Sequence, residues 1–194
     1  MSKHFLEIQK GDFIASEKNK VNNVNLIIEE QGQIISLLGP SGIGKTTILR
    51  TLAGLQKLNS GKIFLKGRLI ASSKVHIEPE KRNIALSFQD NSLFPNYKVI
   101  DNINFGKKRS NGNGFSLDTK EIIELLHIDP ILNKFPHQIS AGEAQRVSIA
   151  RSLISKPDLL LLDEPFSNID QSLKEEIQVS VKKLLKRINL TTII

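Results

Sequence analysis

The sequence predicts an α/β fold: a mostly parallel sheet with an N-terminal antiparallel β part and an inserted α-helical lobe. Short apolar runs typical of strands occupy residues 5–8, 24–28, 34–38 and 84–88, and residues 61–65 and 67–70 resemble a short hairpin. The apolar spacing becomes helical between residues 91 and 155, and a wholly apolar run at residues 159–162 restores the strand pattern. Such a run is typical of a strand covered on both faces of a parallel sheet. The order along the chain is therefore core, helical insert, core.

Composition excludes several classes of protein. The chain has 194 residues, 39% of them hydrophobic, which is enough for one sizeable domain. It contains no cysteine, so disulfide frameworks and thiolate metal sites are excluded. The first seven residues lack the apolar stretch of a secretory signal, and no segment reaches the ~20 apolar residues of a membrane span. We therefore expect a cytoplasmic protein.

The net charge of +7 suggests a polyanionic partner, but its distribution favours another explanation. Basic residues are scattered in twos and threes along the chain, and only 5% of the residues are aromatic. Proteins that bind single-stranded nucleic acid usually provide aromatic stacking platforms. We therefore expect solvated surface charge together with a phosphate-site lysine, and no nucleic-acid partner.

A phosphate-binding loop pattern, G-x-x-x-x-G-K-[ST], lies between a predicted strand and a predicted helix. The loop and the residue after it are Gly39, Pro40, Ser41, Gly42, Ile43, Gly44, Lys45, Thr46 and Thr47. The glycines let backbone N–H groups approach phosphate oxygens, and the following helix adds its positive N-terminal end. Lys45 supplies charge for the β- and γ-phosphates, and the Thr46 hydroxyl is a ligand for Mg²⁺. The alternative is a plain glycine-rich turn, but the strand–loop–helix context predicts a site for a nucleoside triphosphate such as ATP.

Two acids, Asp163 and Glu164, end the apolar strand at residues 159–162. Ligands of open α/β sheets bind at the carboxyl ends of the strands. Asp163 is therefore a candidate ligand for Mg²⁺, and Glu164 a candidate general base that polarises an attacking water. The alternative is an acidic helix cap before Pro165, which the phosphate loop in the same chain makes the weaker hypothesis.

A third motif begins a helix at residues 140–143. Ser140 is a good N-cap, and Glu143 follows three residues later, so the segment alone indicates a capping box. Its position just before the acidic strand favours a functional role as well. Two small residues, Ala141 and Gly142, lie between the cap and the glutamate.

Taken in order, these motifs resemble the ATP-binding subunits of ATP-binding cassette (ABC) transporters, from about residue 5 to the last residue. The resemblance makes residues 39–46 the Walker A loop, residues 159–163 the Walker B strand, and residues 140–143 the signature, usually written L-S-G-G-Q. It implies catalytic roles for Lys45, Glu164 and Gln89, the last in a Q-loop where it also binds Mg²⁺. It further implies nucleotide contacts from Ser140, Gly142, Glu143 and the D-loop residue Asp170, and adenine stacking by Phe13.

The resemblance also implies a domain organisation and partners. Residues 1–90 and 156–194 would form the nucleotide-binding core, and residues 91–155 the helical lobe with the signature. Two copies, or one copy and a paralogue, would enclose two ATP molecules head to tail. The pair would lie on the inner face of the cell membrane against an integral permease, with a solute-binding protein as an indirect partner. Leu93, Phe94 and Pro95 are candidates for the permease contact, unless Leu93 and Phe94 simply pack the helical lobe.

Within the family, residues 79–84 and 88–95 resemble importers of inorganic ions and polyamines, and residues 163–170 resemble iron(III)-type importers. We therefore expect an ATP-hydrolysing importer subunit for an inorganic ion such as iron(III). Two alternatives remain open, a non-transport ABC ATPase and a remnant that binds ATP with little turnover.

The sequence departs from the family pattern at its signature and at its end. Ile139, Ala141 and Glu143 replace the usual leucine, glycine and glutamine. A helix at residues 171–189 and a strand at residues 191–194 close the sequence before the family's switch histidine, so we expect a C-terminally truncated chain that binds Mg-ATP and hydrolyses it slowly. We also expect the strand at 191–194 to lie at an open end of the sheet, where an uncovered edge favours association or fraying.

Overall fold

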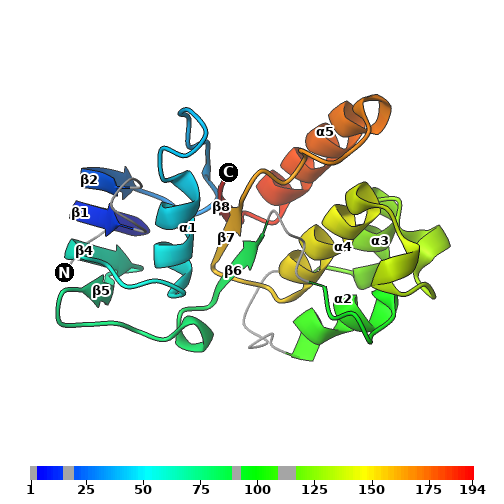
Figure 1. Cartoon of the computed structure of the whole chain (residues 1–194), viewed down its shortest axis with the longest axis horizontal. Helices are drawn as coiled ribbons and strands as arrows, with labels where there is room; N and C mark the ends of the chain where they lie inside the picture. The colour runs from blue at the N-terminus through cyan, green and yellow to red at the C-terminus, as the bar shows by residue number, and fades with distance from the viewer. Residues whose placement is uncertain (1–3, 15–19, 89–92, 109–116) are drawn as a thin grey trace.

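The computed structural model describes residues 4–14, 20–88, 93–108 and 117–194, which form two sheets and a group of helices (Figure 1). In chain order the elements are β1 (Leu6–Ile14), β2 (Lys20–Ile28), β3 (Ile34–Ile35), α1 (Lys45–Ala53), β4 (Ser60–Leu65), β5 (Arg68–Ser72), η1 (Pro79–Lys81), β6 (Ile84–Ser87), α2 (Val99–Lys108), α3 (Thr119–Leu125), η2 (Asp129–Ile131), η3 (Pro136–Gln138), α4 (Ala141–Ile154), β7 (Leu159–Leu162), α5 (Gln171–Arg187) and β8 (Thr191–Ile193). Within this part of the chain, no helix is long and apolar enough to cross a bilayer.

The N-terminal sheet is antiparallel, with strand order β2-β1-β4-β5. Alternate residues of β1 point into the core, and Leu6, Ile8 and Phe13 are almost fully buried. Their partners in this core include Leu49 and Leu52 of α1. Figure 1 shows α1 lying between this sheet and the second one, so the helix that follows the phosphate loop is held from both sides.

The second sheet is parallel, with strand order β3-β8-β7-β6. Strand β8 pairs with β3 on one side and with β7 on the other. The expectation that residues 191–194 lie at an open end of the sheet is therefore wrong. In the described part of the chain the edge strands are β3 and β6, and the backbone of β8 is hydrogen-bonded on both sides, for example from Ile194 N–H to the Ile35 carbonyl at 2.8 Å.

Strand β7 joins the two hydrophobic cores of the molecule. Leu160 and Leu162 face the core built with the helices, whereas Leu159 and Leu161 face the core built with α1 and the antiparallel sheet. All four side chains are fully buried. The wholly apolar run thus has the burial expected for a strand covered on both faces.

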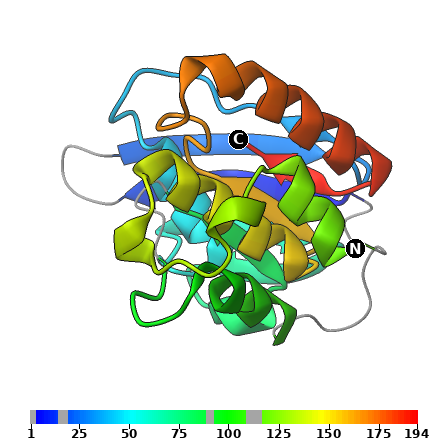
Figure 2. The same ribbon diagram turned by 90° about the vertical axis from the view of Figure 1, so that its right-hand side faces the viewer.

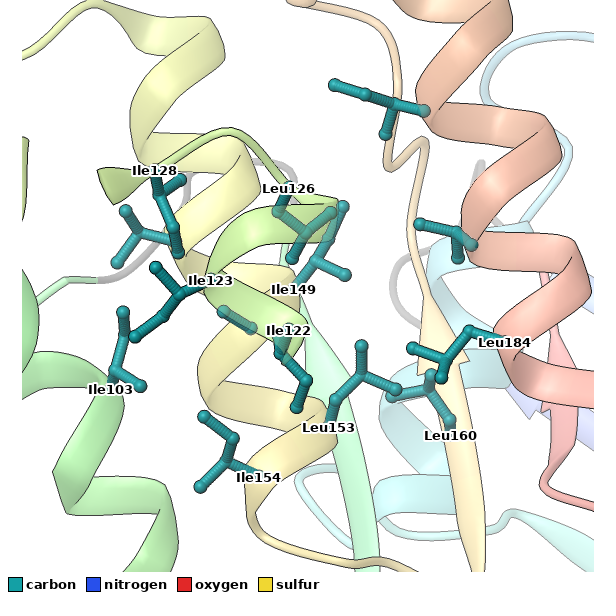
Figure 3. Packing of buried hydrophobic residues seen from close by; sticks show 14 of the residues in the cluster. Ile103, Ile122, Ile123, Leu126, Ile128, Ile149, Leu153, Ile154, Leu160 and Leu184 are labelled. Carbon is teal, nitrogen blue, oxygen red and sulfur yellow. The ribbon is translucent and has the colours of Figure 1, made fainter. Parts of the chain in front are cut away.

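Helices α2, α3 and α4 form a lobe on one side of the parallel sheet (Figures 1 and 2). Its side chains are continuous with those of the sheet, because Leu153 of α4, Leu160 of β7 and Leu184 of α5 belong to one cluster (Figure 3). Ile103 and Ile122 extend this cluster into α2 and α3. Helix α4, which begins at the predicted signature, is therefore part of the lobe and also packs against β6 and β7.

The apolar run at residues 34–38 differs from the buried strand that the sequence predicts. Strand β3 comprises only Ile34–Ile35, both half-buried, and the Leu38 side chain is 92% exposed. The physical reason is position, since β3 lies at the edge of the sheet and has a strand on one side only.

Candidate functional site

The phosphate loop lies between β3 and α1 and is shaped by glycine at the start of the helix. Gly44 is the N-cap of α1 and has a φ of 109°, a left-handed conformation that favours glycine. A Cβ atom at this position would lie only 2.4 Å from Cγ2 of Val21 in β2. The loop is therefore in close contact with the antiparallel sheet, and a side chain at Gly44 would push them apart.

Lys45 and the two threonines after it occupy the first turn of α1. The Lys45 Nζ donates to the carbonyl oxygens of Gly39 at 2.7 Å and Pro40 at 3.0 Å, so its ammonium group lies over the loop backbone. Thr46 is half-buried, and Thr47 is buried. The helix dipole adds positive potential at the same end, which makes this turn suited to an anion.

A pocket of about 240 Å³ brings the loop lysine to the acids at the end of β7. Lys45, Asp163 and Glu164 line it, together with the apolar side chains of Leu49 and Leu162. The pocket lies at the carboxyl end of the parallel sheet, where α/β proteins bind ligands. Residues far apart in the sequence thus form one concave site with a cationic and an anionic wall.

The two acids of this pocket have different environments. Asp163 is 7% exposed, and its backbone N–H donates to the Ser87 carbonyl at 3.1 Å, which ties it to β6. Glu164 is exposed and has a φ of 48°, a strained backbone conformation for a residue other than glycine. The chain turns sharply here, between the buried strand and the segment that leads to α5.

A second hollow of about 240 Å³ lies at the start of α4. Ser140, Gly142, Glu143 and Asp170 line it, so the predicted signature and D-loop residues are side by side. The predicted capping box is present: the Ser140 Oγ accepts from Glu143 N–H at 3.2 Å, and the Glu143 carboxylate accepts from Ser140 N–H at 2.7 Å. That N–H bond holds the pKa of Glu143 below its usual range.

Arg146 gives this second hollow a cationic wall. Its guanidinium donates to the Leu126 and His127 carbonyls, both at 3.1 Å, at the end of α3. Burial lowers the pKa of Arg146, although the carboxylates of Glu143 and Asp170 act in the opposite direction. The signature helix is thereby fastened to the rest of the helical lobe next to the hollow.

Size alone does not mark the site. A larger hollow of about 800 Å³ lies along β3 and α5, lined by side chains such as Ile34, Val181 and Leu185. None of the phosphate-loop or signature residues lines it. We base the site on the pocket that contains Lys45, Asp163 and Glu164, because chemistry and not volume identifies a phosphate site.

Of the described site residues that the sequence predicts, loop residues 39–44, Thr46, Thr47 and Phe13 line neither pocket. Phe13 is 0% exposed and packs in the core beneath the antiparallel sheet, so the expectation that its ring stacks on adenine is not supported by this structure. Sheet packing explains the difference, since Phe13 is an inward-facing position of β1. Gln89, the predicted Q-loop residue, lies outside the described residues.

The three residues of the candidate permease contact, Leu93, Phe94 and Pro95, have different environments in the structure. The Phe94 and Phe105 rings make an edge contact, with their centroids 4.6 Å apart. The Arg151 Cζ atom lies 5.5 Å from the Phe94 centroid, over the face of that ring. Leu93 is partly buried against the helical core. Phe94 and Leu93 therefore pack the helical lobe, while Pro95 is exposed.

Two buried polar side chains, which are not among the predicted site residues, hold these segments in place. Arg82 is 3% exposed and donates to the Thr51 and Leu52 carbonyls, which satisfies the C-terminal end of α1. Burial lowers the pKa of Arg82 to about 10. Gln145, 1% exposed, joins α4 to the segment after β7. No prediction from the sequence covers either residue, because their partners are distant along the chain.

Comparison with known proteins identifies the family. The family described as ABC transporter matches residues 21–167, a range that contains the phosphate loop, the start of α4 and the two acids after β7. The chain belongs to the ABC transporter family. Its resemblance to that family therefore holds over most of the sequence, including the motifs that line the two pockets.

Curated relatives of this ABC family member are import ATP-binding proteins. The glucose import ATP-binding protein GlcV of Saccharolobus solfataricus is 38% identical over 189 residues, 96% of this chain and 52% of that protein. The spermidine/putrescine import ATP-binding protein PotA of Nitrosospira multiformis is 42% identical over 175 residues, 89% and 47% respectively. The Fe(3+) ions import ATP-binding protein FbpC of Escherichia coli O157:H7 is 36% identical over 193 residues, which are 98% of this chain and 54% of that protein. The chain spans about half the length of these relatives.

Solved structures confirm the predicted fold class. The dimeric ATP-binding cassette MJ0796, in a post-hydrolysis state bound to ADP and Pi, matches with a TM-score of 0.80 and 24% identity, over 97% of this chain and 86% of that one. The cbiO1 protein of Clostridium perfringens, part of the ABC transporter complex cbiONQ, matches with a TM-score of 0.75 and 26% identity, over 99% of this chain and 78% of that one. The α/β core with its helical lobe is thus an ABC cassette.

Proposed function

We propose that this chain is the ATP-binding and ATP-hydrolysing part of an ABC importer. The observation that carries the proposal is the pocket at the carboxyl end of the parallel sheet, which Lys45, Asp163 and Glu164 line together. The names of the curated relatives support it, because each is described as an import ATP-binding protein.

The proposed chemistry divides the work between the two walls of this pocket. The loop N–H groups, the Lys45 ammonium and the N-terminal end of α1 bind the triphosphate and stabilise negative charge on the γ-phosphate. The Glu164 carboxylate accepts a proton from the attacking water, or orients that water, as the bond to the γ-phosphate forms. The bond between the γ-phosphorus and the bridging oxygen of ADP breaks as the bond to the water oxygen forms, so ADP stays on the loop and inorganic phosphate is released.

The donor set fits Mg²⁺ as part of the bound nucleotide. In the described residues, no cluster of three or more His, Cys, Asp or Glu side chains could hold a metal alone. Mg²⁺ needs no such cluster, since it is commonly bound by one or two protein oxygens together with substrate phosphates and water. The Thr46 hydroxyl and the Asp163 carboxylate would supply those oxygens, with Gln89 as a further proposed ligand. When bound, Mg²⁺ neutralises charge on the phosphates.

We further propose a head-to-tail pair of cassettes as the working unit. The hollow at the start of α4, with Ser140, Gly142, Glu143 and Asp170, would cover the ATP on the other cassette's phosphate loop. ATP then links two protein surfaces and favours the closed pair until the γ-phosphate is released. An integral permease, contacted around Pro95, and indirectly a solute-binding protein complete the proposed assembly, on the inner face of the membrane.

For the solute we propose an inorganic ion such as iron(III), from the likeness of residues 163–170 to iron(III)-type importers. The relatives are named for glucose, spermidine/putrescine and Fe(3+) import, so the family relationship supports an importer more strongly than a particular solute. Uptake of radiolabelled iron(III) by cells that carry or lack the gene tests this proposal. Equal uptake by both would contradict it.

Glu164→Gln in the full-length protein tests the proposed hydrolysis. The change keeps the size of the side chain and removes the base, so phosphate release should fall by roughly 100-fold or more while ATP affinity is retained. Glu175→Gln, at an exposed acid of α5, is the matched control and should behave as wild type. Equal turnover in Glu164→Gln and wild type would remove Glu164 from the proposed mechanism.

A further inference from the structure

Gln145 is a buried amide that binds the backbone on both sides of the turn after β7. It lies in the second turn of α4 and is 1% exposed. Its Nε2 donates to the Glu164 carbonyl at 2.9 Å, and its Oε1 accepts from Asn168 N–H at 3.1 Å. One side chain of the signature helix thus spans the whole segment from the second acid to the D-loop.

The orientation of this amide follows from its partners. A carbonyl can only accept and a backbone N–H can only donate, so the reversed amide would face each partner with the wrong group. Both amide atoms of Gln145 are used, and both bonds are partly buried. Deleting the amide would remove the acceptor of the Asn168 N–H and one donor to the Glu164 carbonyl, and the loss of such bonds costs stability.

The segment that Gln145 holds is strained at its first residue. Glu164 has a φ of 48°, and such conformations persist only when the surroundings enforce them. The Glu164 carbonyl also accepts from Ser167 N–H at 3.2 Å and Ser167 Oγ at 3.0 Å, so the turn is closed from inside while Gln145 fixes it to α4. The direction in which the Glu164 side chain leaves the backbone depends on this turn.

A second contact brings α4 against the same segment. A Cβ atom at Gly142 would lie 2.7 Å from the carbonyl oxygen of Asn168 and 3.5 Å from Cα of Ile169. The absence of a side chain at Gly142 therefore lets the first turn of α4 approach the D-loop backbone. Gly142 and Gln145 are three residues apart and lie on the same face of the helix.

We infer that Gln145 is a positioning residue, through which the signature helix sets the orientation of Glu164 and of the D-loop. The inference rests on the proposed function, in which Glu164 is the general base for ATP hydrolysis. Movement at the start of α4, where the second cassette's nucleotide would bind, is passed through the Gln145 amide to the base of its own site. Gln145 touches neither nucleotide nor water in this role.

The test compares Gln145→Met with Ser148→Ala in the full-length protein. Ser148 is one helical turn further along α4, is 1% exposed, and forms a buried bond to Ser87 Oγ at 3.1 Å, so it is a matched buried polar control. We expect Gln145→Met to lower kcat at least tenfold with an unchanged Kd for ATP, and Ser148→Ala to keep the wild-type kcat. Gln145→Glu is the second variant, because it keeps an acceptor for Asn168 N–H while it replaces the donor to the Glu164 carbonyl by a carboxylate oxygen.

Coupling to Glu164 separates positioning from a purely structural role. If Gln145 acts through the base, Gln145→Met should cost no further kcat in a Glu164→Gln background, whereas independent effects would multiply. Multiplying effects, or a kcat for both Gln145 variants equal to that of wild type, would overturn the inference and leave the proposed function intact. A wild-type protein without ATP hydrolysis would instead overturn the proposed function, and the inference with it.

Discussion

Helices α1 and α4 both begin at segments that the sequence marks for phosphate contact, but their first turns are completed differently. Helix α1 starts after Gly44, which has no side chain with which to cap it, and its first residue is the cation Lys45. Helix α4 starts after Ser140, whose hydroxyl and backbone are both paired with Glu143. The N-terminus of α1 therefore has N–H groups without a side-chain cap and a positive charge. The N-terminus of α4 has N–H groups paired within its capping box and a carboxylate.

Under the proposed function, this difference separates a site that binds an anion from one that covers it. An anion at α1 meets the helix dipole, loop N–H groups and Lys45 together. An anion at α4 must approach a turn that already holds a carboxylate, and it gains only where Arg146 and the dipole outweigh that charge. We therefore expect nucleotide to bind first at α1, with α4 of a second cassette joining afterwards.

Among the tests of this comparison between α1 and α4, the largest expected effect is at α1. Lys45→Ala removes a charge-assisted phosphate contact worth about 2 kcal/mol, which corresponds to roughly a thirtyfold higher Kd for ATP. The fold should be unaffected, because the hydrogen bonds of the Lys45 ammonium to the described residues are with carbonyls of its own loop. Titration with a fluorescent ATP analogue and thermal melting measure the two quantities. Lys57→Ala, at an exposed lysine beyond α1, is the control, and unchanged affinity in Lys45→Ala would make the loop assignment wrong.

A second effect, on stability and not on affinity, is expected where α4 contacts the predicted D-loop. Gly142→Ala places a Cβ atom 2.7 Å from the Asn168 carbonyl oxygen, so helix or loop must shift. Overpacking of this kind costs about 1–3 kcal/mol in the free energy of unfolding. Urea denaturation checks the value, with Ala141→Gly, at an exposed neighbouring position, as the control. A Gly142→Ala protein as stable as wild type would show that α4 and the D-loop are not in the close contact described.

The smallest effect is at the charge of the α4 capping box. Because the Ser140 N–H holds the pKa of Glu143 below its usual range, the ionised carboxylate stabilises the folded state. That contribution is present above the unfolded-state pKa of about 4.3 and is lost as the pH falls through the lower folded-state pKa. Glu143→Gln should therefore lower the free energy of unfolding at pH 7 by less than about 1 kcal/mol. Urea curves at neutral and acidic pH check this, and an equal difference at both would contradict it.

Motifs made of neighbouring residues could be located from the sequence, because their chemistry depends on local spacing. The glycines and lysine of the phosphate loop, the acids after β7 and the Ser140–Glu143 pair all lie where the spacing places them. The order of the strands in the parallel sheet could not be predicted from local spacing. Strand β8 lies between β3 and β7 because hydrogen bonds join it to segments far away along the chain, and no local pattern encodes that choice.

The identity of the elements, the family and the phosphate loop therefore follow from the order of the residues, since propensity, periodicity and short motifs act over a few residues at a time. Packing determined the rest. Phe13 is an aromatic residue near the nucleotide-binding motifs, yet its alternation in β1 turns the ring into the core. Gln145 is an ordinary helix residue in the sequence, and it links two motifs only because α4 folds against the turn after β7. Burial and hydrogen bonds between distant segments arise when the layers close, so they are properties of the folded chain.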